Sequence, residues 1–467
     1  MSIDAHNPVT LISYMGSTRH GRCGYCTKST SCSFYLRSYD LTVTDYQILL
    51  DRGWRRSGTL LYKPHMTLSC CPQYTIRVDA TTIKTSRDQR QTLHKWSRYV
   101  LGESYVQECA SRYPRSKEEK RRQQSEFNLV ETVHGPEYST LQGLERVPPE
   151  PAHKFEVSLE PTVFTEEKYE LYENYQRTVH NDPVWQITRN DFTNFLCKSP
   201  LKNTTTPTGM RLGSYHQCYR VDGRLVAMGV LDLLPHCVSG VYFMYHEDYR
   251  AWGFGKLSAC REAALAREGG YQYYYMGFYI HSCPKMWYKR EYGPCHLLDP
   301  ETYAWNLFDG KLERLLDKHG YVGASTIRLH GATEKNDVSE KAPGSAPSGN
   351  MIEAGDQYES EEEDEDVPPG FVFSTKMPGI MTKREIEDFD ARTLRFQLAG
   401  SEITAKELEE LDLATYIDDS LVALRANAGV FAGFGMLLGC IKDSDYRYKE
   451  VMDRFGYHMP LLGNYIF

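Results

Sequence analysis

The spacing of apolar residues divides the first 330 positions into strand-like and helix-like segments. Alternating or continuously apolar runs predict strands at residues 60–63, 74–78, 155–159, 214–221, 224–234, 240–245 and 271–279. Apolar residues three or four positions apart predict helices at residues 41–52, 87–101, 166–180, 192–196 and 255–267. Three consecutive strands followed by a helix and a further strand are typical of an α+β fold.

Composition divides the chain further. We predict a compact cysteine-bearing domain at residues 1–110, a polar linker at 111–151, a second domain at 152–330, an acidic linker at 331–372 and a helical C-terminal extension at 373–467. The acidic linker has few apolar residues to bury, so we expect it to be disordered. Within the extension, a helix is expected at residues 401–416.

Charge is distributed unevenly along the chain. The net charge of −8 combines +6 over residues 1–330 with −14 over the remainder, so only the first part favours a polyanionic partner. No apolar run approaches the roughly 18 residues of a membrane span, and the first ten residues contain no apolar signal core. We therefore expect a protein of the reducing cytoplasm, the nucleus or both, without a membrane partner. The odd count of 13 cysteines argues against a disulfide framework.

Four cysteines near the start of the chain form two close sets, Cys23 with Cys26 and Cys70 with Cys71. A CxxC spacing lets two sulfurs reach one ion, and an adjacent pair supplies two more where the backbone turns sharply, as Pro72 favours. Thiolates in this arrangement suit Zn²⁺ or an iron–sulfur cluster, and the sequence leaves both open.

A glycine-rich turn precedes the helix predicted at residues 255–267. Gly253 and Gly255 leave backbone N–H groups free at the positive end of the helix dipole, and Lys256 adds a charge. Acyltransferases with the acetyltransferase fold hold a phosphate-bearing acyl carrier in this way, although an ordinary helix start has the same residues. The chain has no Walker A or dinucleotide-binding glycine motif, so neither an ATP nor an NAD site is expected.

The strand predicted at residues 271–279 carries six aromatic residues in nine positions, more than a packed strand requires. One of its faces suits a cage for a guanidinium or a stacking platform for a base, and the alternative is a core strand with its hydroxyls at the surface. Lys285 follows Pro284, whose rigid turn would hold an ammonium near the end of this strand, where it suits an anionic substrate.

Asp232 lies inside an apolar strand, and a buried carboxylate needs a partner. It is either one half of a structural ion pair or the receptor for a cationic substrate. His216 and His236 are possible bases, although a single histidine is more often structural.

Several runs of residues resemble the eukaryotic arginyl-tRNA–protein transferases. They are CGYC at 23–26, GWRRSG at 53–58, YKP at 62–64, CCPQYTIR at 70–77, FLC at 195–197, DLLP at 232–235, SGVYF at 239–243, GKLSA at 255–259, YYYMGFYI at 273–280 and CPKM at 283–286. The resemblance extends over about two-thirds of the chain, from residue 15 to residue 328, with the motifs in the family's order.

The resemblance implies an enzyme that moves arginine from arginyl-tRNA to the N-terminal α-amino group of proteins beginning with Asp, Glu or oxidised Cys. The product is a degradation signal read by ubiquitin ligases. The resemblance also implies an acetyltransferase-like (GNAT-type) catalytic domain behind a Cys-rich N-terminal domain that binds Zn²⁺ or an iron–sulfur cluster. Because arginyl-tRNA is already an activated ester, no ATP site is required.

For this reaction, Lys285 and Tyr279 are the candidate catalytic residues, and Lys285 or Arg220 would meet an acidic acceptor. The candidate substrate-binding residues are Asp232, Tyr242, Gly255, Lys256, Tyr273 and Tyr275. Arg55 and Arg56 are the candidates for tRNA phosphates.

Two rival functions remain open. A binding protein for acidic N-termini, with an inactive transferase domain, would lack the intact glycine–lysine turn and tyrosine-rich strand found here. An acetyltransferase of the same fold would depend on coenzyme A rather than tRNA.

Overall fold

The computed structural model describes residues 11–329 apart from residues 27, 29, 115, 119–120, 122–126 and 143–148, together with residues 377–378 and three short strands between 395 and 426. The larger sheet runs in the order β13 (Trp305–Leu307), β12 (Cys295–Leu298), β5 (Tyr74–Asp79), β11 (Tyr273–Tyr279), β10 (Cys237–Tyr245), β9 (Arg224–Leu234), β8 (Arg211–Val221) and β6 (Phe155–Pro161), with β7 (Thr204–Thr205) beside β8. Neighbouring strands in it are antiparallel except β10 and β11, which are parallel.

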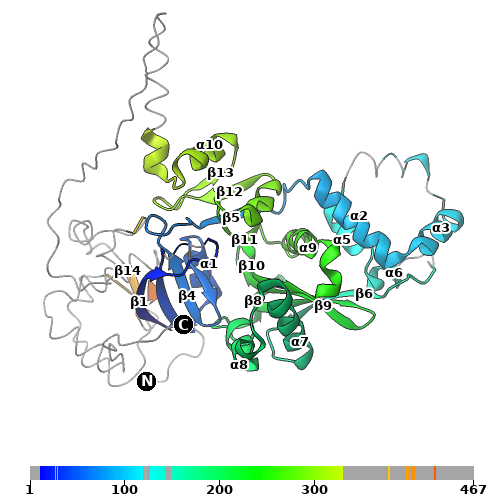
Figure 1. Cartoon of the computed structure of the whole chain (residues 1–467), viewed down its shortest axis with the longest axis horizontal. Coiled ribbons are helices and arrows are strands. Elements are labelled where there is room, and N and C mark those ends of the chain that lie inside the picture. The colour runs from blue at the N-terminus through cyan, green and yellow to red at the C-terminus, as the bar shows by residue number, and fades with distance from the viewer. Residues whose placement is uncertain are drawn as a thin grey trace, which may run out of the picture.

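The N-terminal part of the chain forms a smaller, four-stranded sheet, drawn in blue in Figure 1. It runs in the order β1 (Leu11–Gly21), β2 (Ser31–Asp40), β4 (Leu60–Pro64) and β3 (Arg55–Ser57). Helix α1 (Val43–Leu50) begins at Thr42, whose side chain accepts a hydrogen bond from the Asp45 N–H. Buried residues of α1 and this sheet share one apolar cluster with Leu234, Cys237 and Tyr275 of the larger sheet, so the two sheets pack together.

Helices cover both faces of the larger sheet. On one face lie α9 (Phe254–Glu268), α2 (Arg87–Leu101) and α5 (Leu129–His134), and on the other lie α7 (Glu166–Tyr175) and α8 (Arg189–Phe192). Successive residues of β9 divide between the faces: Ala227 and Leu231 join the cluster around α9, whereas Met228 and Val230 join the cluster around α7. The smaller sheet shares the α7 face, because Leu234 points to it while Leu233 points toward α9.

Most predicted elements are confirmed, and α2 has the predicted bounds. The helix predicted at 166–180 divides into α7 and a π-helical turn, η1 (Gln176–His180), and the helix predicted at 192–196 divides between α8 and a second π-helical turn, η3 (Thr193–Cys197). Up to residue 329, the elements not predicted are strands β1, β2, β3, β7, β12 and β13, helices α3 (Glu103–Arg112), α5, α6 (Tyr138–Gln142) and α10 (Gly310–His319), and the 3-10 helices η2 (Val184–Gln186), η4 (Glu247–Trp252) and η5 (Pro284–Glu291). Strand β6 is two residues longer than predicted. The predicted α+β class describes the observed mixture.

The large sheet crosses the boundary predicted at residue 110. Strand β5 comes from the N-terminal part, yet it lies between β11 and β12, as the blue strand among green ones in Figure 1 shows. The polar linker predicted at 111–151 also contributes to the core, because Leu129 and Val133 of α5 are buried against α9.

Beyond residue 329 the structure describes little. Strands β14 (Arg395–Leu398), β15 (Ser401–Thr404) and β16 (Arg425–Ala426) form a small antiparallel sheet. The helix predicted to begin at residue 401 is therefore wrong at its start, where a β-branched pair, Ile403 and Thr404, lies in β15. The acidic linker at 331–372 and most of the extension at 373–467 lie outside the described residues. No helix in the described part of the chain is long and apolar enough to cross a membrane.

Candidate active site and metal centre

The described sheets contain one pair of parallel strands, β10 and β11, and these two strands are hydrogen-bonded over a short length only. Strands β10 and β11 pair at only three positions, of which Ser239 with Tyr275 is the last. Both strands are irregular just beyond: the register of β10 shifts between Gly240 and Tyr242, and that of β11 shifts between Tyr275 and Phe278. We call this place the β10–β11 split. The pairing between these two strands thus ends in the middle of the sheet.

Helix α9 begins beside this sheet without a side-chain cap. Gly253 precedes it in the left-handed conformation (φ 69°), which favours glycine, and no side chain bonds the first N–H groups. Gly255 is exposed, and Lys256 forms an ion pair with Asp88 of α2. The predicted glycine–lysine turn is thus present at the surface, with its lysine held by α2.

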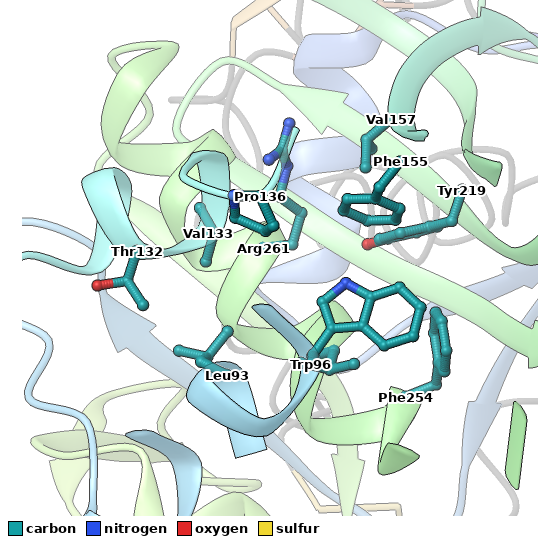
Figure 2. A pocket seen from close by; sticks show the side chains of 11 residues that line it. Leu93, Trp96, Thr132, Val133, Pro136, Phe155, Val157, Tyr219, Phe254 and Arg261 are labelled. Carbon is teal, nitrogen blue, oxygen red and sulfur yellow. The ribbon is translucent and has the colours of Figure 1, made fainter. Parts of the chain in front are cut away.

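A cluster of aromatic side chains packs against the first turn of α9. Figure 2 shows Trp96 of α2 facing Phe155, Tyr219 and Phe254 around a small cavity, with Arg261 on the opposite wall. The rings of Trp96 and Phe254 meet edge to face, with centroids 5.0 Å apart. The cavity belongs to the packed core, and its aromatic wall fixes the position of the first turn of α9.

Glu262 lies on α9 directly behind the β10–β11 split. A side chain at Gly240 would come within 3.1 Å of one Glu262 carboxylate oxygen, and the Tyr274 hydroxyl donates a hydrogen bond of 2.7 Å to the same oxygen. Burial raises the pKa of Glu262 to about 7, and the smaller effect of the Tyr274 hydrogen bond acts in the opposite direction. A carboxyl group with a pKa near neutrality at this place was not predicted from the sequence.

This pKa makes a prediction about stability. Because the folded pKa lies above the unfolded value, the contribution of Glu262 to stability is present below about pH 4.5 and is lost as the pH rises through 7. Glu262→Gln cannot ionise, so its melting temperature should exceed that of the wild type at pH 8, and the difference should shrink at pH 5. Glu170→Gln, on the exposed side of α7, is the control. A larger advantage at pH 5 than at pH 8 would contradict the assignment.

The tyrosine-rich strand does form a cage for a guanidinium, but the guanidinium is the protein's own. The Arg77 guanidinium carbon lies 3.7 Å from the ring centre of Tyr273 and 3.8 Å from that of Trp305. Arg77 also donates to the Tyr275 hydroxyl, which in turn donates to Asp51. Tyr273 and Tyr275, which the sequence predicts to bind substrate, therefore each have a ring face that Arg77 covers.

Asp232 and Arg56 are also corrected by the structure. The two side chains form a bidentate ion pair at 2.6 and 2.7 Å, and their side chains are 0% and 1% exposed. Ser214 donates a further hydrogen bond to Asp232. Arg56 therefore does not reach tRNA phosphates, and Asp232 does not receive the substrate arginine. Of the two roles open for Asp232, the structural ion pair is the one observed.

The other predicted bases and cations are His216, His236 and Arg220, and each has its own surroundings. His216 is buried against the Leu196 carbonyl, and burial lowers its pKa to about 4. His236 is exposed at the turn between β9 and β10. Arg220 is already paired with Glu160 and Glu167. Arg220 is thus neutralised within the protein, which removes it as the cation for an acidic acceptor.

The candidate catalytic residues lie near the end of β11. Lys285 is exposed on η5. Tyr279 is buried, its hydroxyl lies 3.0 Å from His281 Nδ1, and burial raises its pKa to about 12. Tyr242 lies on the α7 side of β10, where its hydroxyl donates to Gln176 of η1. The structure does not bring Lys285, Tyr279 and Tyr242 into one cluster of contacts.

The four predicted cysteines come together. Their sulfur atoms lie within 4.8 Å of one another, and those of Cys26 and Cys70 are 3.4 Å apart. Tetrahedral Zn²⁺ with bonds of about 2.3 Å separates its sulfurs by about 3.8 Å, so the spacing fits such an ion. Cys23 and Cys71 are buried, and they share an apolar cluster with Ile280 and Cys283. The donor set is all thiol, which suits zinc and iron–sulfur clusters equally.

This cysteine site touches the end of the tyrosine-rich strand, a relation the sequence did not reveal. The Ser282 hydroxyl donates to the Cys71 sulfur at 3.6 Å, and Cys283 immediately precedes η5. A bound metal at Cys23, Cys26, Cys70 and Cys71 would therefore fix the segment that leads from β11 into η5.

Comparison with known proteins identifies the family. Residues 21–91 match the N terminus, and residues 167–299 the C terminus, of the family described as arginine-tRNA-protein transferase. Arginyl-tRNA–protein transferase 1 of Drosophila melanogaster is 29% identical over 434 residues, covering 71% of this chain and 88% of that protein. The Arabidopsis thaliana protein of the same name is 28% identical over 478 residues, covering 66% and 75%. The chain belongs to the arginyl-tRNA–protein transferase family.

More distant similarities extend the comparison. An aspartate/glutamate leucyltransferase of Pseudomonas fluorescens is 25% identical over 284 residues, covering 60% of this chain and 92% of that protein. Among solved structures, one match is the C-terminal domain of a putative lysylphosphatidylglycerol synthetase from Agrobacterium fabrum. The match covers 51% of this chain and 52% of that chain, with 11% sequence identity and a TM-score of 0.24. The latter similarity is too weak to support an argument.

Proposed function

We propose that this protein transfers arginine from arginyl-tRNA to the N-terminal α-amino group of proteins that begin with Asp, Glu or oxidised Cys. Transfer of arginine from tRNA to proteins follows from its family. The acidic acceptor rule is supported by the name of the Pseudomonas fluorescens relative, which pairs aspartate and glutamate with a leucyl group. One acceptor rule would then serve enzymes that carry different amino acids.

The observation that carries the proposal is the β10–β11 split above α9, the helix that follows β10. A parallel pair that separates there can offer backbone groups to an acyl carrier, and the uncapped start of the same helix offers positive potential to its phosphates. This arrangement supports assignment of residues 152–330, together with β5, to an acetyltransferase-like (GNAT-type) domain. Gly255 and Lys256 would face the 3′ end of the tRNA.

The chemistry requires little activation. The α-amino nitrogen attacks the arginyl ester carbon, a C–N bond forms, the bond from that carbon to the tRNA ribose oxygen breaks, and the proton lost by the amine is passed to that oxygen, which leaves as a hydroxyl. An α-amino group has a pKa near 8, so a base with a pKa of about 7 at the split can accept this proton. Glu262 is that candidate base, and positioning of the two substrates supplies much of the remaining rate.

The cysteine site would hold Zn²⁺ or an iron–sulfur cluster in residues 1–110. With four thiolates as ligands, zinc keeps no open position, so the metal's contribution would be structural. Cys23, Cys26, Cys70 and Cys71 would link the N-terminal sheet to the segment that follows β11.

The cellular role follows from the reaction. Arginine added to an acidic N-terminus creates a positively charged end, and we propose that ubiquitin ligases read it as a degradation signal. Arginyl-tRNA and acceptor proteins are the expected partners, in the cytoplasm, the nucleus or both.

The test is transfer of labelled arginine from charged tRNA to a peptide that begins with Asp, beside a matched peptide that begins with Gly. We expect label on the Asp peptide alone, lost after RNase treatment. Label on neither peptide, from folded and metal-loaded protein, would favour a binding protein for acidic N-termini. Acetyl transfer from acetyl-coenzyme A without tRNA would favour an acetyltransferase.

A further inference from the structure

Two buried cations face the irregular part of β11 without a carboxylate. Arg55 of β3 is 6% exposed and Lys289 of η5 is 7% exposed. Among the described residues, no acidic side chain lies within ion-pair distance of either. Isolated charges are expensive to bury, and buried cations are normally paired. In the same chain, buried Arg56 is paired with Asp232 and buried Lys168 with Glu160.

The partners of Arg55 are backbone carbonyls and a ring. Its guanidinium donates to the carbonyl oxygen of Trp54 at 2.7 Å and to that of Gly277 at 3.4 Å, and it lies 4.8 Å from the ring centre of Phe278. Its Nε has no hydrogen-bond partner although it is buried. A guanidinium with a free donor can accept an oxyanion as a further partner.

Lys289 contacts the next residue of the same strand. Its ammonium donates to the Phe278 carbonyl at 2.5 Å. Burial, with a smaller contribution from the charge of Arg55, lowers the pKa of Lys289 to about 7. An anion between the two side chains would relieve both the burial and the mutual repulsion.

We propose that Arg55 and Lys289 bind the acidic side chain of the acceptor's first residue. The proposal rests on the function proposed above and adds the residues that set acceptor specificity. Gly277 and Phe278 follow Tyr275, where β10 and β11 stop pairing, so a short Asp or Glu side chain held by these cations leaves its α-amino group close to the β10–β11 split. The sulfinate or sulfonate of oxidised Cys has the same charge and acceptor oxygens.

Lys289 also differs from the lysine that the sequence favoured. Lys285, four residues earlier on η5, is exposed, so its charge is well solvated and interacts weakly with any anion. A buried ammonium interacts with a carboxylate far more strongly, because less water competes for it. The charges of Lys289 and Arg55 would therefore distinguish acidic from neutral side chains.

The test is Lys289→Met, which keeps the length of the side chain and removes a buried charge without a counter-charge. It should not lower the melting temperature, because no acidic partner is left behind. At saturating arginyl-tRNA, KM for an Asp-starting peptide should rise at least about tenfold, since charged hydrogen bonds are lost. The preference for that peptide over an Asn-starting one should fall, with KM for arginyl-tRNA unchanged. Arg55→Gln should show the same loss of preference.

The matched control is Lys63→Met. Lys63 is another buried lysine whose pKa burial lowers to about 7, but its ammonium donates to Tyr303. Its replacement should leave the Asp-to-Asn preference as it is. Folded Lys289→Met with wild-type KM and preference would overturn the pocket, and so would an effect confined to Lys285→Ala. Wild-type protein that transfers arginine to no peptide would instead overturn the proposed function.

If Lys289→Met does not fold, the proposal can be tested by measuring peptide binding to the wild-type protein. An Asp-starting peptide should raise the melting temperature of the tRNA-free protein, and the Asn-starting peptide should do so less. Equal shifts with both peptides would overturn the pocket.

Discussion

Asp232→Asn is expected to lower the free energy of unfolding by about 3–5 kcal/mol, the usual effect of removing one partner of a buried ion pair. The reason is the burial of Arg56, which is 1% exposed and would keep its charge without a counter-charge. Ser214 would also lose the carboxylate to which it donates. Urea or thermal unfolding measures this change.

Two controls make this expectation sharper. Arg56→Met combined with Asp232→Leu removes both charges and should cost less than Asp232→Asn alone. Glu103→Gln breaks the exposed pair with Arg98 and should change stability too little to resolve. If Asp232→Asn had wild-type stability but no longer transferred arginine, the structural role would be contradicted. Asp232 would then be assigned to binding of the substrate arginine.

The position of this ion pair explains why its loss should lower the stability so much. Arg56 lies on β3 of the smaller sheet and Asp232 on β9 of the larger sheet, 176 positions later in the sequence. The pair therefore joins the two sheets at their packed faces. Its loss should loosen the contact between them as well as lower the total stability.

Cys71→Ser is expected to abolish metal binding. Cys71 is buried among the four thiols, and a serine hydroxyl is a poor replacement for a thiolate. Elemental analysis of anaerobically purified protein should give one zinc ion or one cluster per wild-type chain and neither in the variant. A colourless zinc protein and a coloured iron protein distinguish the two possibilities left open by the thiol spacing.

Cys283→Ser is the matched control for this measurement. Cys283 is buried in the same apolar cluster, but it lies outside the set of four sulfurs that converge. Its replacement should leave the metal content unchanged. Full metal content in Cys71→Ser, or its loss in Cys283→Ser alone, would mean that the ligand set is wrong. Because the site adjoins the start of η5, metal loss should also raise KM for acidic acceptors.

Local patterns predicted the elements that local interactions determine. The bounds of α2 follow from its capping box at Ser86 and Gln89 and from Leu93 and Trp96 on one face. The four cysteines were identifiable because thiols at metal-binding spacing are rare. These features need no knowledge of what lies far away in the sequence.

Side-chain partners across the two sheets were not predictable in this way. The tyrosine-rich strand indicated a cage correctly, but no local pattern shows that Arg77 of a neighbouring strand fills it. Likewise, Lys285 and Lys289 are equivalent in the sequence, and only the packing of η5 on β11 buries one and exposes the other. The sequence therefore singled out the strand and the cysteines, whereas the pairing of Asp232 with Arg56 and the contact of Arg77 with the tyrosines came only from the structure.

The place of β5 has a consequence for synthesis on the ribosome. Tyr74 pairs with Tyr279, so this strand must wait for partners made about 200 residues later. At 5–20 residues per second, the delay is on the order of 10–40 s. During that time both edges of an apolar strand are without partners and open to wrong pairing. The nascent chain is thus a natural client for chaperones until β11 and β12 have left the exit tunnel.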